Sequence, residues 1–192
     1  MKWILASASP RRKELLAKLI PSFTILPAKG EEVVCGTPAP NVLVMELARQ
    51  KAEEVAQTAQ AQDKAVLGAD TIVVLDGEVL GKPKDEADAV RMLTALSGRS
   101  HEVYTGVCIV YPNGEKRETI TDYACTEVVF NALSQQQILD YVKTGSPMDK
   151  AGAYGIQDGN LVARIEGSFS NVVGLPLEYV KKMVEKLETK GF

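Results

Sequence analysis

Between Ala65 and Pro83 the chain reads AVLGADTIVVLDGEVLGKP, a β-rich stretch that the Asp76-Gly77 pair turns back on itself as a hairpin. A second pair of strands is expected on either side of Pro112-Asn113-Gly114. Elsewhere, strand patterns alternate with amphipathic helices. Because hairpins make antiparallel neighbours and strand–helix alternation makes parallel ones, the sequence predicts an α/β fold with a mixed sheet.

Hydrophobic periodicity and capping residues place the other elements. We expect strands at 3–6, 23–26, 102–111, 117–130 and 161–165, a loop at 27–40 and a turn at 168–176. We expect helices at 10–19, 41–60 and 85–96. A further helix is expected to begin at a Ser134/Gln137 capping box and to end just before Gly145, and the last helix is expected to run from Leu177 to the C-terminus. The side chains expected to face the core are Leu43, Leu47 and Val55 in the 41–60 helix, and Leu177, Val180, Val184 and Leu187 in the last.

Length and charge limit the class of protein. The 192 residues suffice for a single domain over 1–192, either with one core or pinched into two lobes. A net charge of −3 argues against non-specific binding to nucleic acid polymers. The three cysteines and the single histidine, His101, have no metal-type spacing, which favours a reducing compartment. Because no segment resembles a signal peptide or a membrane span, we expect a cytoplasmic protein without a membrane partner.

The stretch SASPRRKELL at 7–16 places cations where a helix is already positive. Ser9 is a suitable N-cap and Pro10 suits the first helical position, yet Arg11, Arg12 and Lys13 occupy the first turn. Each exposed cation there costs about 0.3–1 kcal/mol. A bound phosphate would offset them, since backbone N–H groups and arginine forks both bind phosphate oxygens. The alternative is a solvated basic turn whose side chains bend away from the helix.

Asp70 is a charged residue inside a β-run, where aspartate is disfavoured and an unpartnered buried charge is costly. Val66, Asp70 and Val74 share one face, and Gly68 is expected to leave room for a group to approach that face. The alternative is an aspartate at a strand edge or bulge, bound by backbone N–H groups.

Lys51 lies along or beside the apolar stripe of the 41–60 helix. Its ammonium either extends to water or points into a cleft that holds an anion. Lys82, in a Gly-Lys-Pro segment, is by itself an ordinary loop lysine. Glu31 and Glu32, together with Asp70, offer the oxygen ligands that magnesium prefers, but Glu31 and Glu32 are equally compatible with surface charge.

Gln157 offers an amide donor and acceptor side by side, which suits the edge of a uracil or thymine ring. The inventory is thus cations, carboxylates and one amide, without a histidine or cysteine nucleophile. Such a set suits metal-assisted attack of water on a phosphoanhydride and does not suit acyl transfer or redox chemistry.

Five blocks of the chain resemble, in order, those of the Maf family of nucleotide pyrophosphatases: SASPRRKELL, GADTIVVLDGEVLGKP, LSGRSHEVYTGV, DKAGAYGIQ and NVVGLP. The match runs from about Ile4 to the C-terminal helix. It implies a fold similar to the inosine-triphosphate pyrophosphatases, with helices flanking a mixed twisted sheet and two lobes around a cleft. It also implies hydrolysis of a nucleoside triphosphate to the monophosphate and pyrophosphate, with Mg2+ or Mn2+ as the cofactor.

The resemblance implies a role for each matching residue. Asp70 corresponds to the proton acceptor, and the specificity positions are Arg11, Thr71 and Gln157. Arg12, Glu32, Lys51 and Lys82 correspond to the remaining polar cleft residues of the family. We hypothesise that the triphosphate binds to Ser7, Ser9, Arg11, Arg12, Lys51 and Lys82. The metal is expected on Glu32 and Asp70. Whether Asp70 acts as base, as metal ligand or as both stays open at this point.

Arg11, Ala69-Asp70-Thr71 and Tyr154-Gly155-Ile156-Gln157 resemble the branch acting on dTTP and UTP, rather than the branch acting on 7-methyl-GTP. Asp158 departs from the pattern, since glycine is commoner there, and its carboxylate either alters the base pocket or points outward. Modified pyrimidine nucleotides are an alternative substrate class. A nucleotide-binding regulator of septum formation with little turnover is the alternative function. The oligomeric state is open, with a homodimer as one alternative.

Overall fold

The computed structural model describes residues 1–189, so the predicted continuation of the last helix to residue 192 lies outside the described residues. The strands are β1 (Lys2–Leu5), β2 (Thr24–Ile25), β3 (Lys64–Leu75), β4 (Glu78–Leu80), β5 (Ser100–Asn113), β6 (Lys116–Phe130) and β7 (Val162–Glu166). The α-helices are α1 (Pro10–Ala17), α2 (Pro40–Ala56), α3 (Glu86–Leu96), α4 (Gln135–Lys143), α5 (Phe169–Val173) and α6 (Leu177–Thr189). Short 3-10 helices are η1 (Ala59–Ala61), η2 (Ser146–Asp149) and η3 (Ala151–Ala153).

The strands of the described chain form one seven-stranded sheet in the order β2-β1-β3-β5-β6-β7, with β4 paired to β3. β1 is parallel to β2 and β3, whereas β4 is antiparallel to β3 and β7 is antiparallel to β6. The sheet is therefore mixed and flanked by helices, which confirms the predicted fold class.

The chain divides into two compact units. The first comprises 1–70, 105–124 and 174–189, and the second comprises 71–104 and 125–173. β3, β5 and β6 each contribute residues to both units. The two units agree with the predicted two lobes, and the cleft expected between the lobes stays a prediction.

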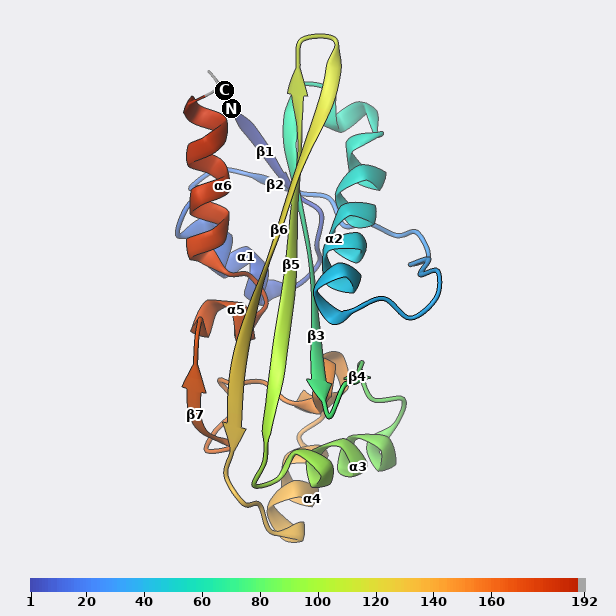
Figure 1. The fold of residues 1–192 in the computed structure, drawn as a ribbon, viewed down its shortest axis with the longest axis vertical. Helices are drawn as coiled ribbons and strands as arrows, with labels where there is room; N and C mark the ends of the chain where they lie inside the picture. Colours follow the sequence, from blue (N-terminus) through green and yellow to red (C-terminus); the bar gives the residue numbers. More distant parts are fainter. Residues whose placement is uncertain (190–192) are drawn as a thin grey trace. The chain divides into compact units, whose positions relative to one another are not determined.

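In the first unit, α2 lies on one side of the strands and α6 on the other (Figure 1). One apolar core joins α2 to β1, β3 and β5 through the buried side chains Ile4, Ala48, Ala52, Val55, Val66, Cys108 and Val110. Small residues on α2 let the helix lie close to the sheet, and this fixes the height of its polar side chains above the strands.

In the second unit, α3 packs against α4, and both helices contact 3-10 segments (Figure 1). Their shared core includes Leu93 and Leu96 of α3, Ile138 and Tyr141 of α4, and Tyr154. The capping box is present, because the Ser134 hydroxyl accepts from the Gln137 backbone while the Gln137 side chain accepts from the Ser134 N–H.

Three sequence expectations about helices need correction. α2 ends at Ala56 instead of continuing to residue 60, because the chain turns extended at Thr58, whose hydroxyl donates to the Val55 carbonyl at 2.7 Å. The expected turn at 168–176 contains the short helix α5, whose first turn the Ser168 hydroxyl caps by accepting from the Asn171 N–H. The inward faces also differ. In α6 Met183 is buried, whereas Leu177 and Val184 are only half-buried, and in α2 Leu43 is only half-buried.

No helix in residues 1–189 combines the length and the apolar character needed to cross a membrane. Within residues 1–189, Cys35, Cys108 and Cys125 are free thiols.

Candidate functional site

Helix α1 begins with the basic turn that the sequence singles out. Ser9 is its N-cap, with its hydroxyl accepting from the Arg12 backbone N–H at 3.4 Å, and Pro10 takes the first helical position. Arg11 occupies the same turn and is half-buried. The first turn of α1 holds no acidic residue, so the negative charges near Arg12 come from other parts of the first unit.

The Arg12 guanidinium folds back against the chain instead of extending into water. Its Nε donates to the Gly174 carbonyl at 2.8 Å, and its Nη1 donates to the Ser7 hydroxyl at 3.4 Å. Burial lowers the pKa of Arg12, whereas the negative charges of Asp70 and Glu32 raise it. Arg12 stays a cation, and it lies within electrostatic range of both carboxylates that the sequence assigns to a metal.

Strand β3 carries the predicted catalytic residue at its centre. From Ala65 to Leu75 every residue is buried except Asp70 and Thr71. A charged side chain that is only partly buried, in the middle of an otherwise buried strand, is consistent with a ligand site.

Gly68 shows why the aspartate and the lysine meet. As the sequence predicts, the missing side chain leaves room for a group to approach this face, and that group is the backbone of α2. A Cβ at Gly68 would lie 2.4 Å from the carbonyl oxygen of Ala48 and 2.8 Å from the nitrogen of Ala52. The missing side chain therefore lets the α2 backbone lie directly on β3, which brings Lys51 of α2 to Asp70.

Lys51 binds two carboxylates at once. Its ammonium lies 2.8 Å from Glu32 Oε1 and also donates a hydrogen bond to Asp70 Oδ1. The Lys51 and Asp70 side chains are 21% and 13% exposed, so this pair is shielded from water, whereas Glu32 is 47% exposed. The ammonium points at two carboxylates of the chain and not into bulk water, which excludes the first interpretation of Lys51, whereas a cleft that holds a bound anion stays a prediction.

Two further side chains of α2 hold the loop that carries Glu32. The Glu54 carboxylate accepts from the backbone N–H groups of Lys29 and Gly30, at 2.7 and 3.0 Å. The Gln50 amide accepts from the Val33 N–H at 3.0 Å and donates to the Val33 carbonyl at 2.7 Å. The loop is thus fixed on both sides of Glu32.

The other three predicted residues belong to the second unit. Thr71 follows Asp70 on β3, Lys82 lies exposed just after β4, and Gln157 is exposed on a turn after η3. The Gly152 N–H of η3 donates to the Gly81 carbonyl at 3.0 Å. The segment that carries Lys82 is therefore attached to the segment that leads to Gln157.

The Asp158 carboxylate does not point outward into water, and its effect on a base pocket stays a prediction. Its carboxylate accepts from the hydroxyls of Tyr141 and Ser146, at 2.8 and 2.6 Å, and lies 3.6 Å from the Lys150 ammonium. Sequence reasoning missed this cluster, as it missed Gln50 and Glu54, because nothing in local spacing shows that residues so far apart in the chain meet.

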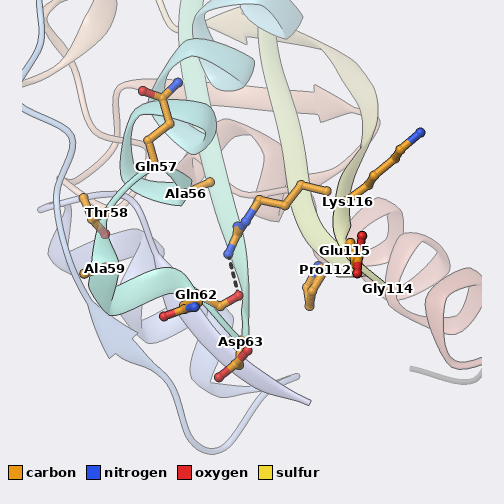
Figure 2. A pocket seen from close by; sticks show the side chains of 11 residues that line it. Ala56, Gln57, Thr58, Ala59, Gln62, Asp63, Pro112, Gly114, Glu115 and Lys116 are labelled. Carbon is orange, nitrogen blue, oxygen red and sulfur yellow. Dashed lines mark hydrogen bonds between the residues drawn. The ribbon is translucent and has the colours of Figure 1, made fainter.

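A separate hollow of about 500 Å3 lies in the first unit, beside the end of α2 and the turn between β5 and β6 (Figure 2). None of the predicted site residues lines it. Its charged lining residues are Asp63, Glu115, Lys116 and Arg117. The acidic and basic side chains balance, and those of Gln57, Asp63 and Lys116 point away from one another in Figure 2, so the hollow does not resemble a triphosphate site.

The model of the family described as Maf-like protein matches residues 2–187. The chain belongs to the Maf family. The resemblance seen in the five sequence blocks is thereby confirmed. Maf relatives similar to this chain include the dTTP/UTP pyrophosphatase of Moorella thermoacetica, 53% identical over 95% of this chain and 93% of the relative. The dTTP/UTP pyrophosphatase of Thermococcus gammatolerans is 49% identical over 95% of each chain.

Solved structures place the Maf chain in the expected fold group. It resembles a HAM1 protein from Coxiella burnetii, with a TM-score of 0.55 and 16% identity over 97% of this chain and 99% of the other. It also resembles the Ham1 protein of Staphylococcus aureus, with a TM-score of 0.52 and 17% identity over the same shares. At these identities the likeness concerns the fold alone.

Proposed function

We propose that this chain is a nucleoside triphosphate pyrophosphatase that hydrolyses dTTP and UTP to the monophosphate and pyrophosphate. The observation that carries the proposal is the Lys51 ammonium, which binds both Glu32 and Asp70 in the unit that also contains the α1 arginines. The names of relatives that cover nearly the whole chain support it. Modified pyrimidine nucleotides fall within the same proposal.

The triphosphate is bound by cations and hydroxyls. Arg11 and Arg12 offer guanidinium forks at a helix N-terminus, where backbone N–H groups also favour an anion. An anion bound there offsets the cations of a turn that has no acidic residue of its own. The residues that we assign to the phosphates are Ser7, Ser9, Arg11, Arg12, Lys51 and Lys82.

Asp70 is assigned to the attacking water. Lys51 binds its Oδ1, and the second oxygen orients a water and takes its proton. The water oxygen forms a bond to the α-phosphorus while the bond from that phosphorus to the bridging oxygen breaks, and pyrophosphate leaves. Positioning and charge neutralisation do most of the catalytic work in such a reaction.

A divalent cation, Mg2+ or Mn2+, fits the donor set. Glu32 and Asp70 already converge on one positive centre, the Lys51 ammonium. Residues 1–189 contain no group of three or more His, Cys, Asp or Glu side chains suited to a metal. Two carboxylates together with substrate phosphate oxygens are the arrangement that Mg2+ prefers. When bound, the ion would supply neutralisation of the phosphate charge.

Base recognition is assigned to Arg11, Thr71 and Gln157, on the family pattern. The Gln157 amide is exposed and offers a donor and an acceptor. This pair matches the adjacent N–H and carbonyl at the edge of uracil or thymine, which supports a preference for pyrimidine nucleotides.

We also propose a cytoplasmic location. The free thiols of Cys35, Cys108 and Cys125 support it, since such thiols persist in reducing compartments.

Burial raises the pKa of Cys108 to about 12, so this thiol is not a nucleophile at neutral pH.

The proposal is tested by the products formed from UTP and Mg2+ in 18O-labelled water. We expect UMP and pyrophosphate in equal amounts, with the label in UMP, because attack on the α-phosphorus puts the water oxygen on the monophosphate. GTP and 7-methyl-GTP, as matched substrates, should react more slowly. Label in pyrophosphate, UDP as the product, or faster reaction of the guanine nucleotides would contradict the proposal. Tight binding of UTP without turnover would favour the regulator instead.

A further inference from the structure

A closed turn presents Gln157. The backbone N–H of Asp158 donates to the Gly155 carbonyl at 3.0 Å, so Ile156 and Gln157 are the two central residues of a four-residue turn. Gln157 is exposed, whereas the residues at both ends of the turn are half-buried. The direction of the Gln157 amide therefore depends on how the ends of the turn are held.

One hydroxyl holds both ends. The Tyr141 hydroxyl accepts from the Gly155 N–H at 3.1 Å and donates to Asp158 Oδ2 at 2.8 Å. Tyr141 is a buried residue of α4, packed in the core of the second unit. Burial raises the pKa of Tyr141, so its hydroxyl remains a donor at neutral pH. A rigid ring in the core thus fixes the distance between the two ends of the turn.

The Asp158 carboxylate is the charged centre of this anchor. Its Oδ2 also accepts from the Ser146 hydroxyl at 2.6 Å, and the Lys150 ammonium lies 3.6 Å away with only 10% of its side chain exposed. Lys150 in turn donates to the Ser146 hydroxyl at 2.9 Å. Burial acts to raise the pKa of Asp158, but the hydrogen bonds from Ser146 and Tyr141 and the Lys150 charge lower it overall, so the carboxylate is ionised at neutral pH.

The turn fits this anchor without spare room. A Cβ at Gly155 would lie 2.7 Å from Asp158 Oδ2 and 2.8 Å from Lys150 Cε. A residue with a Cβ at this position would require the Asp158 carboxylate or the end of the Lys150 side chain to shift.

We propose that Asp158 is a positioning residue for base recognition, which fixes through Tyr141, Ser146 and Lys150 the turn that aims the Gln157 amide at the edge of a pyrimidine. The inference rests on the role that the proposed function gives to Gln157. An amide distinguishes uracil from cytosine only if its donor and acceptor are held in one orientation, because rotation by half a turn exchanges them. The anchor therefore sets selectivity and leaves the chemical step to the first unit's residues.

The test compares two variants, Asp158→Asn and the control Asp140→Asn. Asp140 is an exposed residue of α4 next to Tyr141, and its carboxylate binds Gln136 and Lys143. Dissociation constants for UTP and CTP are measured without added metal, so that the result does not depend on turnover. We expect Asp158→Asn to reduce the preference for UTP over CTP about tenfold, the size of one well-placed hydrogen bond. Asp140→Asn should keep the wild-type preference.

Tyr141→Phe provides a second variant, since it removes only the hydroxyl that ties both ends of the turn, and it should shift the preference in the same direction. A folded Asp158→Asn or Tyr141→Phe protein with the wild-type preference would overturn the inference. Equal binding of UTP and CTP by the wild type would overturn it as well. A wild-type protein that prefers UTP but does not release pyrophosphate would contradict the proposed function. The role of Asp158 would still be tested in that case, because the binding preferences of the variants are measured without turnover.

Discussion

The single histidine, His101, is part of the core of the second unit and is not assigned to catalysis. Its Nε2 lies 2.8 Å from the Tyr154 hydroxyl, and the rings of Phe130 and Tyr154 meet it edge-on at 5.1 and 5.4 Å. Its Nδ1 is buried and has no hydrogen-bond partner among the described residues. Burial lowers the pKa of His101 from 6.5 to about 4, so the native protein holds it neutral.

His101 predicts a pH-dependent stability. Between pH 6.5 and 4 the unfolded chain protonates this histidine and the native protein does not, so native stability falls as the pH falls. From pH 7.5 to 5 the contribution is about 2 kcal/mol. We expect the free energy of unfolding in urea to drop by that much more for the wild type than for His101→Gln. Equal pH dependence of the two proteins would show that the buried imidazole is not the cause.

Sequence reasoning located the residues that contradict their surroundings. Asp70 and Arg12 were found because a charge within a strand and a cation at a helix N-terminus each conflict with a local rule. The partners that resolve these conflicts, such as Gly174 for Arg12, are distant in the sequence and are visible only in the structure. Tyr141 gave no signal because its spacing on α4 is that of an ordinary core residue.

At the scale of elements, periodicity and caps predicted most helices and strands, and the errors came from contacts beyond the local pattern. The shift from Val184 to Met183 in α6 is an example, since both residues fit an apolar stripe and only packing decides which one is buried. At Gly68 the sequence correctly predicts that a group approaches the strand, and only the structure shows that this group is α2.

Helix α2 is the element that assembles the first unit's site, since it supplies Lys51 and holds the Glu32 loop through Gln50 and Glu54. We expect Glu54→Ala to free the Lys29 and Gly30 amides. Hydrogen exchange in this loop should then be about tenfold faster, as expected for the loss of charge-assisted hydrogen bonds.

Glu53→Ala is the matched control for this experiment, because the Glu53 carboxylate binds Arg49 on the same helix and not the loop. Its loop should exchange at the wild-type rate. Unchanged exchange in Glu54→Ala would mean that the loop does not depend on α2.

At the scale of the whole molecule, the mixed sheet and its helices were predictable from the alternation of hairpins and strand–helix pairs. The boundary between the two units was harder to predict from the sequence. β3 passes from one unit to the other between Asp70 and Thr71, and no break in composition marks that point. The two residues that the family pattern assigns to catalysis and to specificity are thus neighbours on one continuous strand.

The central claim is that Asp70 activates the water, and the rate of pyrophosphate release from UTP by Asp70→Asn tests it most directly. The control is Asp63→Asn, an exposed residue just before β3 that lines the separate hollow. We predict that the rate of pyrophosphate release falls at least about 100-fold in Asp70→Asn, as for removal of a general base. The control should keep the wild-type melting temperature and the wild-type rate. A folded Asp70→Asn protein that releases pyrophosphate at nearly the wild-type rate would contradict the account.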